Sequence, residues 1–197
     1  MATYGISGTA SGYAISNLRA KLGAIARPNN FLVSLQTPSF TQGGSIRSDK
    51  PNQYDIAPTF EFRCEKAELP GRTVATSEDM GSGPTIKLAY DMTFNDIQLS
   101  IICANDMKER KFFEKWMDYI VKPWGSLDAG TVAYYNDYAK NNTLFVSQLD
   151  DSGNTILTYQ CTDVYPIALT PMNATWEETN TYQRFGVTLA YRHHVLV

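Results

Sequence analysis

Alternating apolar and polar residues predict β-strands along most of this chain. In such a pattern every second side chain fills one face of a strand, and the intervening polar side chains face water. The pattern predicts strands at Asn30–Gln36, Thr59–Leu69, Arg72–Ser77, Thr85–Tyr90, Asp96–Ala104, Thr143–Leu149, Thr155–Val164, Ile167–Met172 and Gln183–Val197. Between two of them, residues 150–154 (Asp-Asp-Ser-Gly-Asn) have the composition of a hairpin turn. The tyrosine-rich stretch Val132–Tyr138 fits either a strand or an exposed aromatic surface.

One segment, residues 105–121, instead has the period of a long helix. Its large apolar residues recur every three or four positions, and its charged residues fall largely on the opposite face. Asn105 is the expected N-cap, Asp106 the acid of the first turn, and Pro123 the residue that stops the helix. An isolated helix of this length is marginal in water, so its apolar stripe has to pack on a sheet. The residues expected to make that contact are Phe113, Trp116, Met117 and Ile120.

These patterns predict a mainly β fold class, an antiparallel β-sandwich or barrel-like domain with one principal α-helix packed on the sheet. A length of 197 residues suits one domain. Twelve Tyr, nine Phe and three Trp favour strands over helices. We expect this domain to span residues 15–197, with a short helix within 15–25. Residues 1–14 are small and polar and are expected to form a flexible N-terminal arm.

A long connection, residues 37–58, separates the first two predicted strands. It has no periodicity and is interrupted by proline and glycine, yet it contains several apolar residues. Connections of this length inside a compact domain usually have a function. One interpretation is a contact arm to a neighbouring subunit; the others are a loop folded back on its own domain, or disorder. The candidate contact residues are Phe40, Ile46, Arg47, Tyr54 and Ile56.

The remaining composition counts against several functional classes. A net charge of −3 argues against a dedicated nucleic-acid binder. Cys64, Cys103 and Cys161 lie far apart in apolar runs and are expected to be buried free thiols. The histidines are adjacent, so on a strand they point to opposite faces and do not favour a shared metal. We find no signal peptide, no membrane-spanning run, and no catalytic or phosphate-binding motif. The chain therefore reads as a structural or binding protein without a cofactor, rather than an enzyme.

Three consecutive segments carry a more specific resemblance. Phe62–Arg72 (FRCEKAELPGR) is a strand ending in a Leu-Pro-Gly turn, and Ile97–Cys103 (IQLSIIC) is the strand that precedes the helix. Asp106–Trp116 opens the helix with D-M-x-x-R and continues with F-F-x-x-W. This order of elements and motifs resembles the tail tube protein of contractile-tailed (T4-type) bacteriophages. The match covers about 60 residues well, and the rest of the chain agrees with it in general plan.

The resemblance implies a function in the tail of a virion. It implies a hexameric ring whose sheets join into an inner β-barrel, and rings that stack into a tube inside a contractile sheath. DNA would pass through the lumen during ejection without specific binding. The implied partners are further copies of the chain, the tail sheath protein, the baseplate and tail terminator proteins, and the tape measure protein. Assembly would take place in the host cytoplasm, with no membrane involved.

Other functions stay open at this point. A baseplate tube-initiator protein of the same fold would have a similar sequence. A β-sandwich carbohydrate-binding module could use Tyr134, Tyr135 and Tyr138 as a stacking platform. An enzyme of unrecognised type is a third alternative, against which the shortage of histidines and of acid–base motifs counts.

Overall fold

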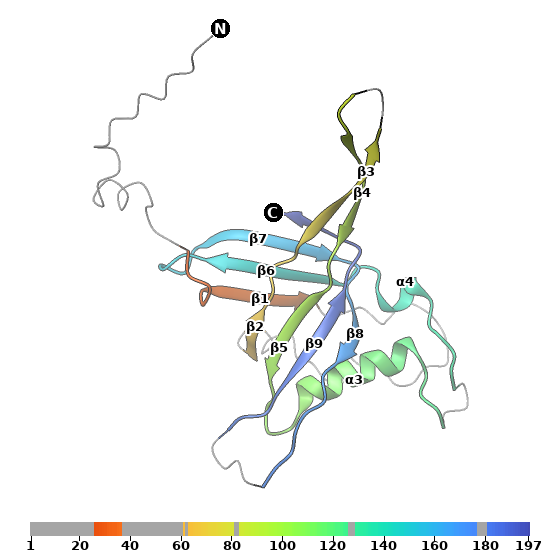
Figure 1. Ribbon diagram of the computed structural model, residues 1–197. Coiled ribbons are helices and arrows are strands. Elements are labelled where there is room, and N and C mark those ends of the chain that lie inside the picture. The colour runs from red at the N-terminus through yellow and green to blue at the C-terminus, as the bar shows by residue number, and fades with distance from the viewer. Residues whose placement is uncertain (1–25, 37–60, 62, 81–82, 126–128, 177–180) are drawn as a thin grey trace.

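The computed structural model describes residues 26–36, 61, 63–80, 83–125, 129–176 and 181–197. Within these ranges the chain forms two four-stranded antiparallel sheets and a two-stranded ribbon, with a long and a short helix after the ribbon in the sequence. Figure 1 shows the strands of one sheet crossing those of the other, with the longer helix along one side. The expected fold class, mainly β with one principal helix, is confirmed.

The first sheet has the strand order β1-β6-β7-β10. Its strands are β1 (Phe31–Gln36), β6 (Thr143–Leu149), β7 (Thr155–Thr162) and β10 (His193–Leu196). Alternate residues of β1 and β6, including Val33 and Leu144, point into the core. The side chains between them, such as Ser34 and Phe145, are less buried.

The second sheet has the strand order β2-β5-β9-β8. Its strands are β2 (Cys64–Ala67), β5 (Ile97–Ile102), β9 (Arg184–Ala190) and β8 (Tyr165–Leu169). Burial alternates along β5, where Ile97, Leu99 and Ile101 are buried. They join the core residues of the first sheet in a single apolar cluster, so the two sheets form a sandwich around one core.

Helix α3 (Lys108–Ile120) closes the sandwich at the β8 edge. Phe112, Phe113 and Trp116 are fully buried in the common core. The ring of Phe113 meets Phe185 of β9 at a centroid distance of 6.1 Å. The indole N–H of Trp116 donates to the carbonyl oxygen of Tyr138, 3.2 Å away, so its one polar group is satisfied.

The helix begins later than the sequence suggested. Asn105 was the wrong N-cap: Met107 occupies that position with a left-handed backbone (φ 55°), and Asp106 precedes the helix. The Asp106 carboxylate instead accepts the Lys108 N–H at 3.3 Å. The last helical residue is Ile120, and Val121 is extended. The predicted range 105–121 therefore shortens to 108–120.

A buried ion pair fixes the start of α3. Glu109 lies in the first helical turn, is fully buried, and pairs with the Arg63 guanidinium. Its other carboxylate oxygen accepts the backbone N–H of Ala104 at 3.0 Å. The pair joins α3 to the segment that enters β2, and it satisfies a charge that would be costly to bury alone.

Several strand boundaries also differ from the sequence prediction. The strand predicted at Thr59–Leu69 begins only at Cys64, because Glu61 and Arg63 are helical. Tyr135–Tyr138, at the end of the tyrosine-rich stretch, forms the short helix α4 instead of a strand. The expected arm 1–14, the expected helix at 15–25 and the long connection 37–58 lie outside the described residues.

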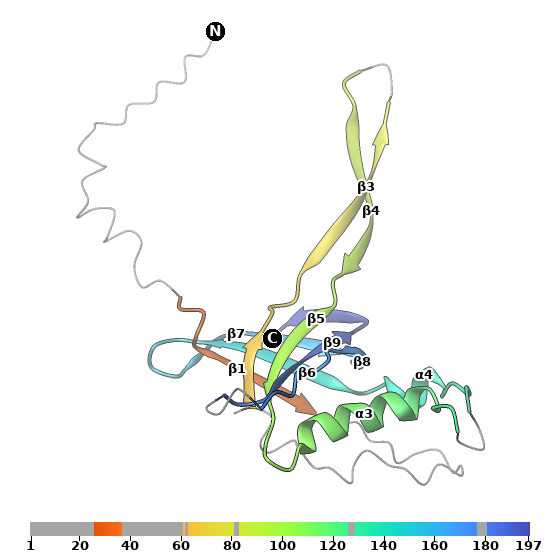
Figure 2. The same ribbon diagram turned by 60° about the horizontal axis from the view of Figure 1, so that its bottom comes forward.

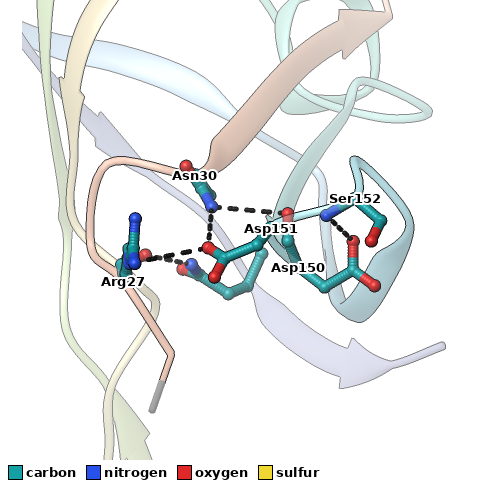
Figure 3. Close-up of polar contacts among 6 residues, drawn as sticks. Arg27, Asn30, Asp150, Asp151 and Ser152 are labelled. Atoms are coloured by element: carbon teal, nitrogen blue, oxygen red, sulfur yellow. Dashed lines mark hydrogen bonds and ion pairs between the residues drawn. The ribbon is translucent and has the colours of Figure 1, made fainter. Parts of the chain in front are cut away.

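The turn between β6 and β7 anchors the entry of the chain into β1. The Asp150 carboxylate accepts the backbone N–H groups of Ser152 and Asn154, both at 2.8 Å. These bonds to the ionised form lower the pKa of Asp150, those from Asn154 most. Figure 3 shows the Asn30 amide reaching Asp151, to whose carboxylate it donates at 3.1 Å. The Arg27 guanidinium lies 3.6 Å from the same carboxylate.

Replacing Glu109 by alanine should lower the free energy of unfolding by about 1–3 kcal/mol. The substitution leaves Arg63 without its partner and the Ala104 N–H without its acceptor. Urea unfolding monitored by tryptophan fluorescence measures the change. Glu114→Ala is the matched control: it removes a helix carboxylate whose pair with Arg110 is partly exposed, so about 0.5 kcal/mol or less is expected. Equal effects of the two substitutions would contradict this account of Glu109.

Candidate assembly surface

The most prominent surface feature is a two-stranded ribbon that leaves the body of the molecule. Strands β3 (Arg72–Asp79) and β4 (Ile86–Phe94) pair with one another, and within the described chain neither pairs with a third strand. We call this ribbon, made of residues 72–79 and 86–94, the hairpin arm. Figures 1 and 2 both show it projecting away from the two sheets. It continues the strands β2 and β5, so the second sheet positions it directly.

The hairpin arm exposes apolar side chains that a monomer would normally cover. Ile86 is 60% exposed, Leu88 50% and Tyr90 71%. Val74 and Met92 are also exposed, at the end of the arm nearer the body. Several large apolar side chains exposed on one element mark an interaction site, and the unpaired strand edges offer backbone groups to a further strand. The arrangement is suited to assembly rather than to catalysis.

A β-bulge divides the arm into two halves. Ala75 is aligned with Asp91 and Thr76 with Ala89, so Tyr90 has no partner position on β3. Because side chains alternate between faces, this one-residue shift moves the following positions to the other face. Val74 and Met92 therefore face one way in the half near the body. Ile86 and Leu88, in the distal half, face the other way.

An aromatic cluster holds the base of the arm. The ring of Phe94, the last residue of β4, meets His194 edge-on with 5.1 Å between centroids. Tyr159 of β7 meets the same imidazole at 5.5 Å. The Tyr191 hydroxyl donates to the carbonyl oxygen of Gly71 at 3.4 Å, at the point where the chain enters β3. Side chains of the first sheet thus fix the direction in which the arm leaves the second sheet.

His194 is the titratable centre of this cluster. Its side chain is buried, and the imidazole Nδ1 lies 3.3 Å from the Tyr191 hydroxyl. Burial lowers the pKa of His194, and the positive charge of Arg72 and the neighbouring His193 lower it further. The pKa of Tyr191 is raised to about 12, chiefly by burial. At neutral pH the cluster is therefore uncharged.

The structure places only some of the residues singled out from the sequence. Phe113 and Trp116 are in the core, whereas Met117 and Ile120 are half-buried. Phe112, which widens the apolar stripe, is also fully buried there, and so is Glu109, which the sequence had not placed in this contact region. The candidate contact residues in the long connection, Phe40, Ile46, Arg47, Tyr54 and Ile56, lie outside the described residues.

The tyrosines considered as a carbohydrate platform do not form a flat surface. Tyr135 and Tyr138 meet edge-to-face, with an interplanar angle of 74°. Both also pack edge-on against Tyr165 of β8. Stacking on a sugar needs an open ring face, and this mutual packing uses the rings for structure instead. Tyr134 is highly exposed.

The described part of the chain gives no sign of a metal centre or a reactive thiol. No group of three His, Cys, Asp or Glu side chains in it could hold a metal ion. Burial raises the pKa of Cys64 and of Cys161 to about 12, which keeps both thiols protonated and unreactive. Among the helices of these residues, none has the length and apolar character needed to cross a membrane.

Solved structures with a similar fold come from contractile injection systems. A chain in the cryo-EM structure of the anti-feeding prophage baseplate matches with a TM-score of 0.58 at 13% identity, over 89% of this chain and 97% of that one. A chain in the sheath–tube complex of the extracellular contractile injection system PVC, in its extended state, gives 0.55 at 16% identity, over 97% and 99%. The fold is thus one used by components of contractile injection systems.

The sequence itself identifies the family. A family model described as phage tail tube protein matches residues 26–197, and the chain belongs to that family. It is a structural subunit of a tail tube, and the resemblance drawn from residues 62–116 is confirmed. A comparison with curated proteins gives no match.

The His194 cluster should make stability depend on pH below neutrality. An unfolded histidine binds a proton near pH 6.5, whereas folded His194 has a lowered pKa. Between these two pKa values the unfolded state binds more protons, so the free energy of unfolding falls as the pH decreases from about 6.5. His194→Gln should flatten this part of the pH profile of urea unfolding. The exposed His193→Gln is the control; if it flattened the profile equally, His194 would not be the group responsible.

Proposed function

We propose that the chain forms hexameric rings that stack into the hollow tube of a contractile tail. The observation that carries this proposal is the hairpin arm, an apolar ribbon with open strand edges that extends a sheet beyond its own domain. Contact with another copy would bury apolar side chains that stay exposed within one chain, and this burial would stabilise the assembly. Stacking of identical rings is a heterologous contact that does not close, and it produces a filament.

Further contacts of the tube follow from this role. The tail sheath protein would surround it, and the baseplate and tail terminator proteins would meet its two ends. The chain in the PVC sheath–tube complex, which shares the fold, supports a sheath partner. We propose that the tape measure protein and DNA occupy the lumen without specific binding, which the net charge of −3 favours because phosphate contacts would retard DNA. Assembly would take place in the host cytoplasm.

A baseplate tube initiator is the second candidate. The match to a chain in the structure of the anti-feeding prophage baseplate favours it. An initiator needs only one ring face that fits a tube subunit, whereas a tube subunit needs two that fit each other. The two roles therefore differ in whether purified rings stack on themselves. In neither role would the chain have enzymatic activity.

The purified protein should form rings and long tubes of uniform width in negative-stain electron microscopy at high concentration. The double variant Ile86→Ser/Leu88→Ser should abolish the tubes, because it removes the apolar surface of the distal arm. Both residues are exposed, so the unfolding midpoint should stay unchanged. Thr76→Ala, an exposed change on the same arm, is the control and should form normal tubes. Rings that never stack in the unmodified protein would favour the initiator instead.

Deleting residues 42–51 tests the proposed contact role of the long connection. The domain should still fold, because the deletion leaves every strand of the two described sheets intact. Tube polymerisation, measured by sedimentation and electron microscopy, should be lost. Unaltered tubes would exclude Ile46 and Arg47 from the ring contacts.

A further inference from the structure

We propose that His194 is a pH-sensitive switch at the base of the hairpin arm. While its imidazole is neutral, it holds the arm in one direction; when the imidazole is protonated, the arm is released and the sandwich stays folded. This inference concerns a single subunit. It goes beyond the proposed function and does not depend on whether rings form or stack.

Two backbone connections and one side-chain cluster join the arm to the body. The chain enters β3 directly after Gly71 and leaves β4 at Asn95. The Gly71 carbonyl oxygen accepts two hydrogen bonds, one from the Asn95 N–H at 3.3 Å and one from the Tyr191 hydroxyl at 3.4 Å. The first bond lies within the ribbon, and the second ties it to the body. Because neither strand of the arm pairs with a third strand in the described chain, its direction depends on this cluster.

The imidazole of His194 lies between the arm and the body. Phe94 of the arm meets it at a centroid distance of 5.1 Å, and Tyr159 of β7 meets it at 5.5 Å. The Tyr191 hydroxyl has one hydrogen, which it donates to Gly71, so its oxygen accepts from the imidazole Nδ1–H, 3.3 Å away. Neutral His194 therefore carries its proton on Nδ1, and a second proton has to bind at Nε2.

The charged groups nearest in effect disfavour a positive imidazole. Burial lowers the pKa of His194 most, and the positive charge of Arg72, at the start of the arm, and the neighbouring His193 lower it further. The Asp96 carboxylate acts on Tyr191, whose pKa is raised to about 12, chiefly by burial. It does not offset the positive charges at His194, whose pKa stays lowered.

The remaining neighbours supply no carboxylate to the imidazole. Cys161, opposite His194 on β7, keeps its proton because burial raises the pKa of its thiol to about 12. Tyr159 offers an aromatic ring. In the segment before β10, Arg192 pairs with Asp163 at 3.7 Å, which satisfies that acid. A proton on His194 thus has no counter-ion among these described neighbours, and a state in which the imidazole reaches water binds the proton better.

The release can be local because the switch lies outside the core. Strand β10 is a four-residue edge strand that pairs, within the described chain, with β7 alone. After His194, its residues Val195 and Leu196 are 45% and 62% exposed. Phe94 and Tyr159 are not members of the buried apolar cluster that joins the two sheets. Movement of His194 into water therefore detaches the base of the arm and leaves this cluster intact.

Proton linkage gives the direction and the size of the effect. A released, solvated imidazole has a pKa of about 6.5, whereas the pKa of the held imidazole is lower. The released state therefore gains protons first as the pH falls. Lowering the pH from 7.5 to 5.5 should raise the ratio of released to held arms by up to about tenfold.

The test measures the distance between two spin labels by double electron–electron resonance. The labels are placed at Ser77→Cys in the arm and Lys140→Cys in the body, both exposed positions, in the Cys103→Ser background. Labelled protein is diluted into unlabelled protein, below the concentration at which tubes form. The distance distribution should be narrow at pH 7.5 and should gain a broad component at pH 5.5.

Two histidine variants assign the response. His194→Gln stays uncharged and should keep the narrow distribution at both pH values. His193→Gln is the matched control, because His193 is the exposed neighbour on the same strand, and it should respond like the unmodified protein. An arm distribution that is identical at both pH values would overturn the inference. So would a broad component that persists in His194→Gln or disappears in His193→Gln.

Two further measurements separate arm release from unfolding. A label pair within the body, Lys140→Cys with Ser152→Cys, should keep its distribution at pH 5.5; broadening of this pair would show that the sandwich itself opens and would overturn the inference. Tyr191→Phe removes the hydroxyl bond to Gly71 and should broaden the arm distribution already at pH 7.5. A narrow distribution there would overturn the inference even if His194→Gln failed to fold. Absence of rings and tubes would count against the proposed function and leave these distances unchanged.

Discussion

Closing the open side of a two-sheet sandwich is the constraint on which the rest of this structure depends. Helix α3 meets it by burying Phe112, Phe113 and Trp116 in the cluster to which both sheets contribute. These three side chains exclude water from the cluster, which stabilises the apolar faces of both sheets. Helix α3 covers the core at the β8 edge. Strands β2 and β5 can therefore continue into the hairpin arm without exposing the core to water. The ion pair between Glu109 and Arg63 fixes the start of this helix.

Sequence periodicity was informative wherever a strand or helix has one buried face. The strand Thr143–Leu149 appears with the bounds that its pattern predicts, and the stripe through Phe113 and Trp116 is the buried side of α3. Local signals failed where a distant residue decides the outcome. Asn105 has the side chain of an N-cap, but the start of the helix is set by Glu109, which pairs with Arg63 from another part of the chain. A glutamate in a first turn is normally solvated, so its burial has no local signature.

The assembly surface was harder to predict for a related reason. Both strands of the arm were predicted, β4 from its alternation, and alternation normally means that one face is covered by the same chain. Here the apolar positions Ile86 and Leu88 are left exposed, because the proposed cover is another molecule. The bulge at Tyr90 is also invisible in the sequence, since it depends on how two strands align. Periodicity identifies an apolar face, but it does not reveal what covers that face.

The open edges of the hairpin arm have a consequence for the time between synthesis and assembly. A ribbon with unpaired backbone groups and aliphatic side chains can pair with any exposed strand, including those of misfolded chains. The arm carries Glu78, Asp79, Lys87 and Asp91 among its apolar positions. Charges at such positions act as gatekeepers, since an incorrect partner would have to desolvate them. We therefore expect the charges along the arm to protect a free subunit from aggregation while its apolar groups stay available for the correct contact.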